Sequence, residues 1–201
     1  RKAYLYCPPS SRYSLLSDGS TLLRNLIQKN RNNPVYKAKL VDSLMTIYDQ
    51  RVQYFPKYAI SSLNNKALDM ANYMKDEPMK LLEGLTEIIA QTKEQTRANI
   101  FLFQLNTAVD LYKNSLLDPE SVINVYENAI KNLSAITPKN DVEKRSNEKM
   151  VSDIESIFIK FNSHPLQATI SFRIQKKIEM IWINRIIPIL NKRFNKEFCF
   201  G

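Results

Sequence analysis

The side chains that could perform catalysis are few in this sequence and far apart. The only histidine, His164, directly precedes Pro165 at an expected helix start, where we expect it to cap the helix rather than act as a base. The only two cysteines, Cys7 and Cys199, lie at opposite ends of the sequence. They supply neither a zinc ligand set nor a disulfide framework, so we expect no transition-metal site.

The other catalytic signals are equally weak. Glu83 and Glu87 lie one helical turn apart, but this spacing also occurs on solvated helix faces, and no Glu-x-x-His motif accompanies it. The chain has three glycines, too few for a Rossmann or Walker phosphate loop, and no serine lies in a nucleophile-elbow context. We therefore expect a protein that is not an enzyme and that uses no cofactor.

Binding residues are concentrated near the start of the sequence. Residues 1–60 hold 10 basic and 3 acidic side chains, a net charge of +7, and seven of the ten tyrosines. Arginine and lysine neutralise phosphates, and tyrosine rings stack on unpaired bases. The residues that interleave these two types are Arg1, Lys2, Tyr4, Tyr6, Arg12 and Tyr13. For Tyr36, Tyr48 and Tyr54 we favour core or boundary positions on helices.

The other end of the sequence is also basic. Residues 166–201 hold 7 basic and 2 acidic side chains, and an apolar stripe with Trp182 runs through the expected last helix. A basic amphipathic helix can bind RNA, occupy a partner's groove or lie on anionic lipid. It can equally be the last helix of the domain, with its stripe in the core. We expect Pro188 to kink or end it.

The formal net charge of +9 predicts a polyanionic partner. We expect a non-catalytic protein that binds RNA or a ribonucleoprotein through its basic ends. The side chains expected to contact phosphates are Arg12, Arg24, Lys29, Arg31, Arg173, Lys176, Lys177, Lys192 and Lys196. The alternative is an adaptor or complex subunit with a protein partner, whose basic charge is incidental. A less favoured third is a peripheral membrane protein.

Apolar residues recur at three- and four-residue spacing, which is typical of amphipathic helices. No stretch shows the sustained alternation of a strand, so the sequence predicts an all-α fold with at least seven helices. The stripes span residues 41–55, 60–74, 81–89, 101–112, 122–133, 150–161 and 170–186.

Prolines mark the expected helix starts. Pro34, Pro78, Pro119 and Pro165 each follow a polar residue or lie close to one, and proline is well tolerated at the first helical position. Each interval between them holds two stripes, which predicts an array of helical hairpins like HEAT repeats. Residues 118–130 loosely resemble the first helix of a tetratricopeptide unit. An irregular helical bundle is the alternative.

We expect two parts in the chain. Residues 1–32 form a basic aromatic arm and a short helix, in which the arm is extended, Asp18-Gly19-Ser20 forms a turn, and Ser20 caps a helix over residues 21–29. Residues 33–201 form a single α-helical domain, with an exposed loop in 137–147 that leads into a frayed helix start.

The longest apolar stretch, residues 178–190, is interrupted by Glu179, Asn184, Arg185 and Pro188. It is too short and too polar to span a bilayer, so we expect no transmembrane segment. The low cysteine content favours an intracellular, reducing compartment.

Overall fold

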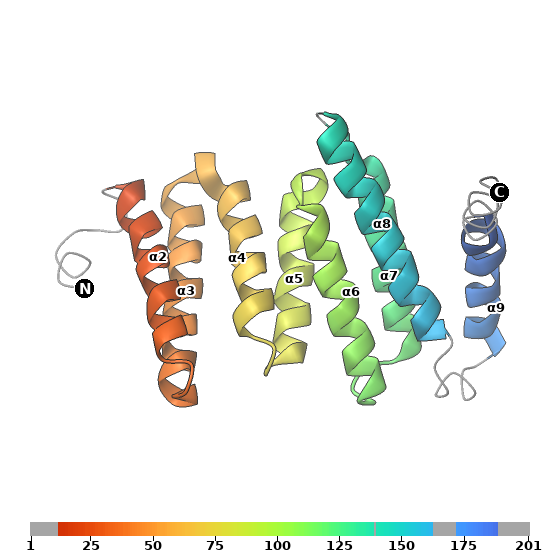
Figure 1. The fold of residues 1–201 in the computed structure, drawn as a ribbon, viewed down its shortest axis with the longest axis horizontal. Helices are drawn as coiled ribbons and strands as arrows, with labels where there is room; N and C mark the ends of the chain where they lie inside the picture. The colour runs from red at the N-terminus through yellow and green to blue at the C-terminus, as the bar shows by residue number, and fades with distance from the viewer. Residues whose placement is uncertain (1–11, 139, 163–171, 189–201) are drawn as a thin grey trace, which may run out of the picture. The chain divides into compact units, whose positions relative to one another are not determined.

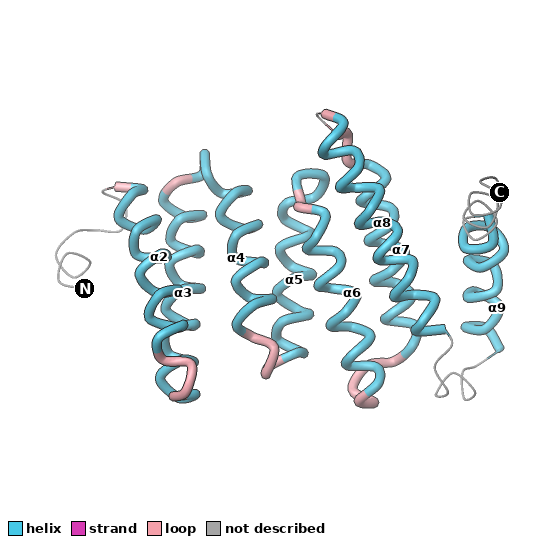
Figure 2. Tube along the Cα trace, in the orientation of Figure 1, coloured by secondary structure: helices cyan, strands magenta, loops and turns pink. Residues whose placement is uncertain are grey.

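A computed structural model describes residues 12–138, 140–162 and 172–188. These residues form eight α-helices and no β-strand, which confirms the predicted all-α fold (Figures 1 and 2). The helices are α2 (Tyr13–Lys29), α3 (Pro34–Tyr54), α4 (Ala59–Tyr73), α5 (Pro78–Thr92), α6 (Ala98–Lys113), α7 (Pro119–Ala135), α8 (Asp141–Asn162) and α9 (Phe172–Ile181). Short 3₁₀ turns, η1 (Pro56–Tyr58) and η2 (Lys93–Gln95), follow α3 and α5, and a π turn, η4 (Trp182–Ile186), follows α9.

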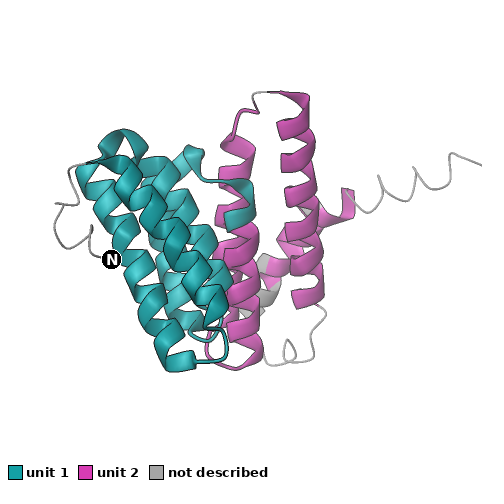
Figure 3. Ribbon diagram, turned by 60° about the vertical axis from the view of Figure 1, so that its left-hand side comes forward, with its two compact units in different colours: residues 1–100 teal, residues 101–201 magenta. Residues whose placement is uncertain are grey.

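The chain divides into two compact units, residues 1–100 and 101–201 (Figure 3). The boundary falls in the first turn of α6. In the first unit, α2 packs on α3, α3 on α4, and α4 on α5. In the second unit, α7 contacts both α8 and α9. The division into residues 1–32 and 33–201 stays a prediction.

The prolines begin helices as predicted. Pro34, Pro78 and Pro119 are the first residues of α3, α5 and α7. Their missing N–H costs no hydrogen bond at this position, since the first amides of a helix have no partner within it. The fourth proline, Pro165, lies outside the described residues with His164.

Polar side chains cap two of these helices. The Oδ1 atom of Asn33 accepts from the backbone amide of Tyr36 at 3.1 Å, and Oδ1 of Asp118 accepts from that of Ser121 at 2.8 Å. The hydroxyl of Ser121, which donates to Oδ2 of Asp118 at 2.6 Å, and the neighbouring backbone amides lower the pKa of Asp118, because they stabilise the ionised carboxylate.

The predicted turn at residues 18–20 is wrong, since α2 runs through it without a break. Ser20 is buried, and its hydroxyl donates back to the carbonyl of Ser17 at 2.7 Å instead of capping a helix start. A β-carbon on Gly19 would lie 3.1 Å from Cδ1 of Ile47, so the glycine lets α2 approach α3 closely. The buried side chains of Leu16 and Ile27 place both ends of α2 against the core.

The core of the first unit includes residues from each of its predicted stripes. Leu44 and Tyr48 of α3, Ala67 of α4 and Leu85 of α5 are completely buried, which confirms their inward orientation. Where α4 contacts α5, a β-carbon on Gly84 would lie 2.2 Å from the Cε atom of Met70. This glycine therefore provides the space that the Met70 side chain fills.

Aromatic rings pack against one another in the core of the second unit. Tyr126 of α7 stacks on Phe158 of α8, with ring centroids 3.8 Å apart. Tyr112 of α6 meets Phe161 of α8 edge to face at 5.0 Å. Pairs of this geometry stabilise a core beyond the apolar area that they bury. They confirm the stripes predicted for these three helices.

The connection between α5 and α6 holds an unusual backbone conformation. Lys93 has φ 49° and ψ −125°, which is strained for a residue with a β-carbon. The loop is fixed to α4 by the buried side chain of Asn64, which donates to the carbonyl of Gln95 at 3.0 Å and accepts from the amide of Arg97 at 2.7 Å. These bonds hold the strained residue in place.

Candidate nucleic-acid interface

The start of α2 and the end of α3 meet in a group of aromatic side chains around one arginine. Tyr13, the first residue of α2, stacks on Tyr58 of η1 with ring centroids 4.2 Å apart and an interplanar angle of 28°. The ring of Phe55 packs edge to face against that of Tyr13, with ring centroids 5.6 Å apart and an interplanar angle of 79°. We call Tyr13, Tyr48, Arg51, Phe55 and Tyr58 the arginine–tyrosine cluster.

Arg51 is buried inside this cluster, with 4% of its surface exposed. Its Nη2 group donates a hydrogen bond to the hydroxyl of Tyr13. The guanidinium carbon lies 4.8 Å from the centroid of the Tyr13 ring and 5.3 Å from that of the Tyr48 ring. Both rings therefore offer the cation a favourable electrostatic contact.

No carboxylate neutralises Arg51 within the described part of the chain, and its Nε atom has no hydrogen-bond partner there. Residues 1–11 contain no Asp or Glu that could supply one. A buried cation without a counter-ion is costly, and the carbonyl end of α3 offsets only part of its charge. This end of the first unit therefore carries excess positive charge.

Exposed cations and rings surround the buried arginine. Arg12 precedes Tyr13, adopts an extended backbone and is exposed, and its side chain makes no capping bond. Lys57 is also exposed, with its Nζ atom 5.9 Å from the ring centroid of Tyr58. Tyr58 is 39% exposed and Tyr54 is 40% exposed. Cations and partly exposed aromatic faces therefore occur together here.

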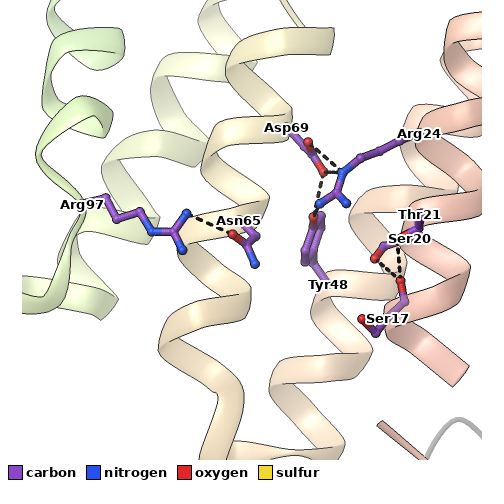
Figure 4. Close-up of polar contacts among 8 residues, drawn as sticks. All are labelled: Ser17, Ser20, Thr21, Arg24, Tyr48, Asn65, Asp69 and Arg97. Atoms are coloured by element: carbon purple, nitrogen blue, oxygen red, sulfur yellow. Dashed lines mark hydrogen bonds and ion pairs between the residues drawn. The ribbon is translucent and has the colours of Figure 1, made fainter. Parts of the chain in front are cut away.

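A second polar group links three helices of the first unit (Figure 4). Nε of Arg24 on α2 lies 2.9 Å from Oδ2 of Asp69 on α4, and the hydroxyl of Tyr48 on α3 donates to the same oxygen at 2.7 Å. Arg24 also donates to the Tyr48 hydroxyl. Burial, followed by the hydrogen bond to Asp69 and the charge of that carboxylate, raises the pKa of Tyr48.

The structure separates the nine predicted phosphate contacts into three groups. Arg12, Lys29, Arg31 and Lys176 are exposed. Arg24 is half-buried and already bonded to Asp69 and Tyr48, so it is less available than predicted. The four others are not described at side-chain level: Arg173 and Lys177 lie on α9, and Lys192 and Lys196 lie outside the described residues.

The predicted phosphate contacts that are exposed in the first unit, Arg12, Lys29 and Arg31, do not lie together. Arg12 precedes the 17-residue helix α2, and Lys29 is its last residue, so the two lie at opposite ends. A helix of this length spans about 25 Å, so these two side chains lie far apart and Arg31 follows Lys29 at the second end. The structure places Arg12, but not Lys29 or Arg31, beside the arginine–tyrosine cluster.

Sequence reasoning missed Arg51, Lys57 and Tyr58 as candidate binding residues. A signal for Arg51 exists, since it lies three residues after Tyr48 and four before Phe55, in register with the apolar stripe of α3. A basic residue at such a position is buried when the helix packs. For Tyr48, the expected core position is confirmed because the side chain is completely buried.

The second unit carries an apolar surface of a different kind. A groove of about 630 Å³ runs between α7 and the C-terminal helical segment, lined in part by Ile130, Met180 and Ile181. Met180, Ile183 and Ile187 are exposed at helical spacing, with Ile183 60% exposed. The opposite side of this segment packs inward through Ile178 and Ile186. Apolar side chains therefore occupy both sides of it.

Across the described ranges, no group of three or more His, Cys, Asp or Glu side chains could hold a metal ion. None of the described helices combines the length and the apolar character that crossing a bilayer needs. No family model, curated protein or solved structure matches the chain significantly.

Proposed function

We propose that this chain is a non-catalytic helical protein that binds RNA, free or within a ribonucleoprotein, through the arginine–tyrosine cluster and its exposed neighbours Arg12 and Lys57. The observation that carries the proposal is the buried Arg51, whose charge no described carboxylate neutralises. Buried charges are poorly screened by salt, so this cation contributes strongly to the potential at the surface above it.

Phosphate groups are the ligands that best match this surface. Cations attract the strand regardless of its sequence, and release of condensed counter-ions drives the binding. Tyrosine rings add stacking, which tolerates any base. Lys29 and Arg31, at the other end of α2, contact the same strand only if it extends over several nucleotides.

We propose no catalytic reaction for this chain. The sequence has one histidine and two widely separated cysteines, which supply no paired nucleophile and base. The side chains at the cluster are cationic or aromatic, a composition that suits electrostatic and stacking contacts.

Fluorescence anisotropy with a labelled single-stranded RNA tests this function. We expect log K to fall linearly as log salt rises, with a slope of about 0.7 for each phosphate contact. Reversing both Arg12 and Lys57 to Glu removes the cations at one phosphate, so the slope falls by about 0.7. The matched control reverses Lys39 and Lys75, which are also exposed in the first unit. Equal losses in the two variants, or no retention of RNA at low salt, contradict the proposal.

The adaptor function remains a second candidate because Met180, Ile183 and Ile187 are exposed on one segment. Apolar side chains at helical spacing are typical of helix-in-groove contacts with a protein partner. An adaptor predicts a native complex that resists salt and nuclease and dissociates with the Ile183→Asp variant. Loss of the complex on nuclease treatment favours RNA instead.

A further inference from the structure

We infer that the arginine–tyrosine cluster recognises an unpaired nucleotide, with its base stacked on Tyr58 and its phosphate bonded to the hydroxyl of Tyr13 between Arg12 and Lys57. The inference rests on the proposed function and names the part of the nucleic acid that this site binds. Three features of the cluster support it: a supported aromatic face, a hydroxyl with a proton to donate, and a buried positive charge.

The aromatic face is held in place before any ligand binds. Tyr58 stacks on Tyr13 at 4.2 Å, and Phe55 contacts Tyr13 edge to face, so the pair is supported on the protein side. Tyr58 nevertheless remains 39% exposed. A ring that is already fixed loses little conformational freedom when a base stacks on it.

The hydroxyl of Tyr13 is prepared to donate. It accepts a hydrogen bond from Nη2 of Arg51, and within the described ranges it donates no hydrogen bond that competes for its own proton. A donor that is itself bonded to a cation is polarised, which strengthens its bond to an anionic oxygen. A phosphate oxygen is the acceptor that suits this position.

Arg51 itself is too deeply buried to touch the ligand, so it acts as a positioning residue through Tyr13. Its guanidinium carbon lies 4.8 Å from the Tyr13 ring centroid. Arg12 and Lys57, which directly precede the two stacked tyrosines in sequence, are the exposed cations that can contact the phosphate.

This arrangement favours single strands over duplexes. In a duplex both faces of each base are covered by neighbouring base pairs, so no base is available to an aromatic ring without unstacking. Phosphate attraction alone does not distinguish the two forms. A preference for unpaired strands is therefore the property that stacking on Tyr58 adds.

Binding of the full chain to four labelled probes tests this inference: a uridine 12-mer, its deoxyribose counterpart, an abasic 12-mer with the same number of phosphates, and a duplex. We expect both single strands to bind roughly tenfold more tightly than the abasic strand and the duplex, as loss of one stacked base predicts. Inorganic phosphate, used as a competitor, should displace all four only weakly.

Single substitutions test whether the arginine–tyrosine cluster causes the preference for single strands. Tyr58→Ala should reduce the tenfold preference over the abasic strand to about one, while Tyr58→Phe keeps it because the ring remains. Tyr13→Phe keeps the stack but removes the donor, so it weakens binding to the uridine and abasic strands alike. The matched control is Tyr36→Ala, since Tyr36 is 42% exposed but lies at the start of α3.

The outcomes separate the inference from the proposed function. If all four probes bind equally, or if Tyr58→Ala and Tyr36→Ala behave alike, the chain binds polyanions but not through a stacked base, and the inference is overturned. If none of the probes binds at low salt, the proposed function fails as well. Thermal unfolding of each variant distinguishes lost binding from lost folding. Tyr58→Phe and Tyr13→Phe retain their rings, so they test binding even if an alanine variant fails to fold.

Discussion

The guanidinium carbon of Arg51 lies 4.8 Å from the ring centroid of Tyr13, although 38 residues separate the two in sequence. The packing of α2 on α3 brings them together, since one is in the last turn of α3 and the other begins α2. Among the described residues, rings and one hydroxyl hold this buried cation. A cation in such a setting contributes less to stability than an apolar side chain of similar size.

Replacing Arg51 with Met should therefore separate stability from binding. We expect the free energy of unfolding of Arg51→Met to stay unchanged or to rise by about 1 kcal/mol, because the desolvation cost of the charge is removed. RNA binding of the same variant should weaken. Urea denaturation and anisotropy measure the two effects. A decrease of about 3 kcal/mol or more in the free energy of unfolding would show that Arg51 stabilises the fold.

Removing the carboxylate of Asp69 should have the opposite effect on stability. Asp69→Ala leaves the guanidinium of Arg24 and the hydroxyl of Tyr48 without their shared partner, and we expect a loss of about 2 to 3 kcal/mol. The control is Asp49→Ala, since the side chain of Asp49 is 60% exposed in its ion pair with Lys66. Exposed pairs contribute under about 1 kcal/mol. Equal losses in urea denaturation would contradict the assignment.

The raised pKa of Tyr48 predicts an alkaline loss of stability. The folded state holds the phenolic proton more tightly than the unfolded state, whose pKa is near the ordinary 10.0. The stabilising contribution is therefore fully present below pH 10 and is lost as the pH rises toward the folded value. The free energy of unfolding should fall above pH 10 by up to about 1.4 kcal/mol per pH unit for this proton.

The Tyr48→Phe variant tests the assignment of this slope. It removes the titrating group, so its alkaline slope should be shallower than that of the wild type. Part of the slope should remain, because burial also raises the pKa of Tyr73 and Tyr112. Parallel curves for wild type and variant between pH 9 and about pH 11 would exclude Tyr48 as the source.

Relief of backbone strain at Lys93 should stabilise the first unit. Its φ of 49° with ψ of −125° is a conformation that glycine adopts far more readily. We expect Lys93→Gly to raise the free energy of unfolding by about 1 kcal/mol, after the greater entropy of glycine in the unfolded chain is counted. Lys93→Ala, which keeps the β-carbon, should show no such gain. If Lys93→Gly instead lowers the free energy of unfolding in thermal or urea unfolding, the backbone at Lys93 is not strained.

Much of the fold was predictable because its signals are local. Proline at Pro34, Pro78 and Pro119 begins a helix for reasons contained within one turn. The apolar stripes likewise depend only on helical spacing. The course of α2 through Gly19 was not predictable, because the preference of Asp-Gly-Ser for a turn is overridden by packing against Ile47 of another helix.

The candidate site was less predictable because it depends on contacts between distant residues. Exposure of Arg12, Lys29 and Arg31 follows from their positions beside and after α2. The internal pairing of Arg24 required the position of Asp69, 45 residues away. The value of Tyr13 as a donor depends on Arg51, and no spacing in the sequence links the start of one helix to the end of the next.

Ultraviolet cross-linking of the full chain to a single-stranded RNA, followed by mass spectrometry of the linked peptides, tests whether RNA binds at the arginine–tyrosine cluster. We predict that cross-links concentrate on Tyr13, Tyr54 and Tyr58. Tyr58→Ala should remove those at its own position, while Tyr36→Ala should leave the pattern unchanged. Cross-links confined to residues 101–201, or none under conditions where the RNA is bound, would contradict this prediction.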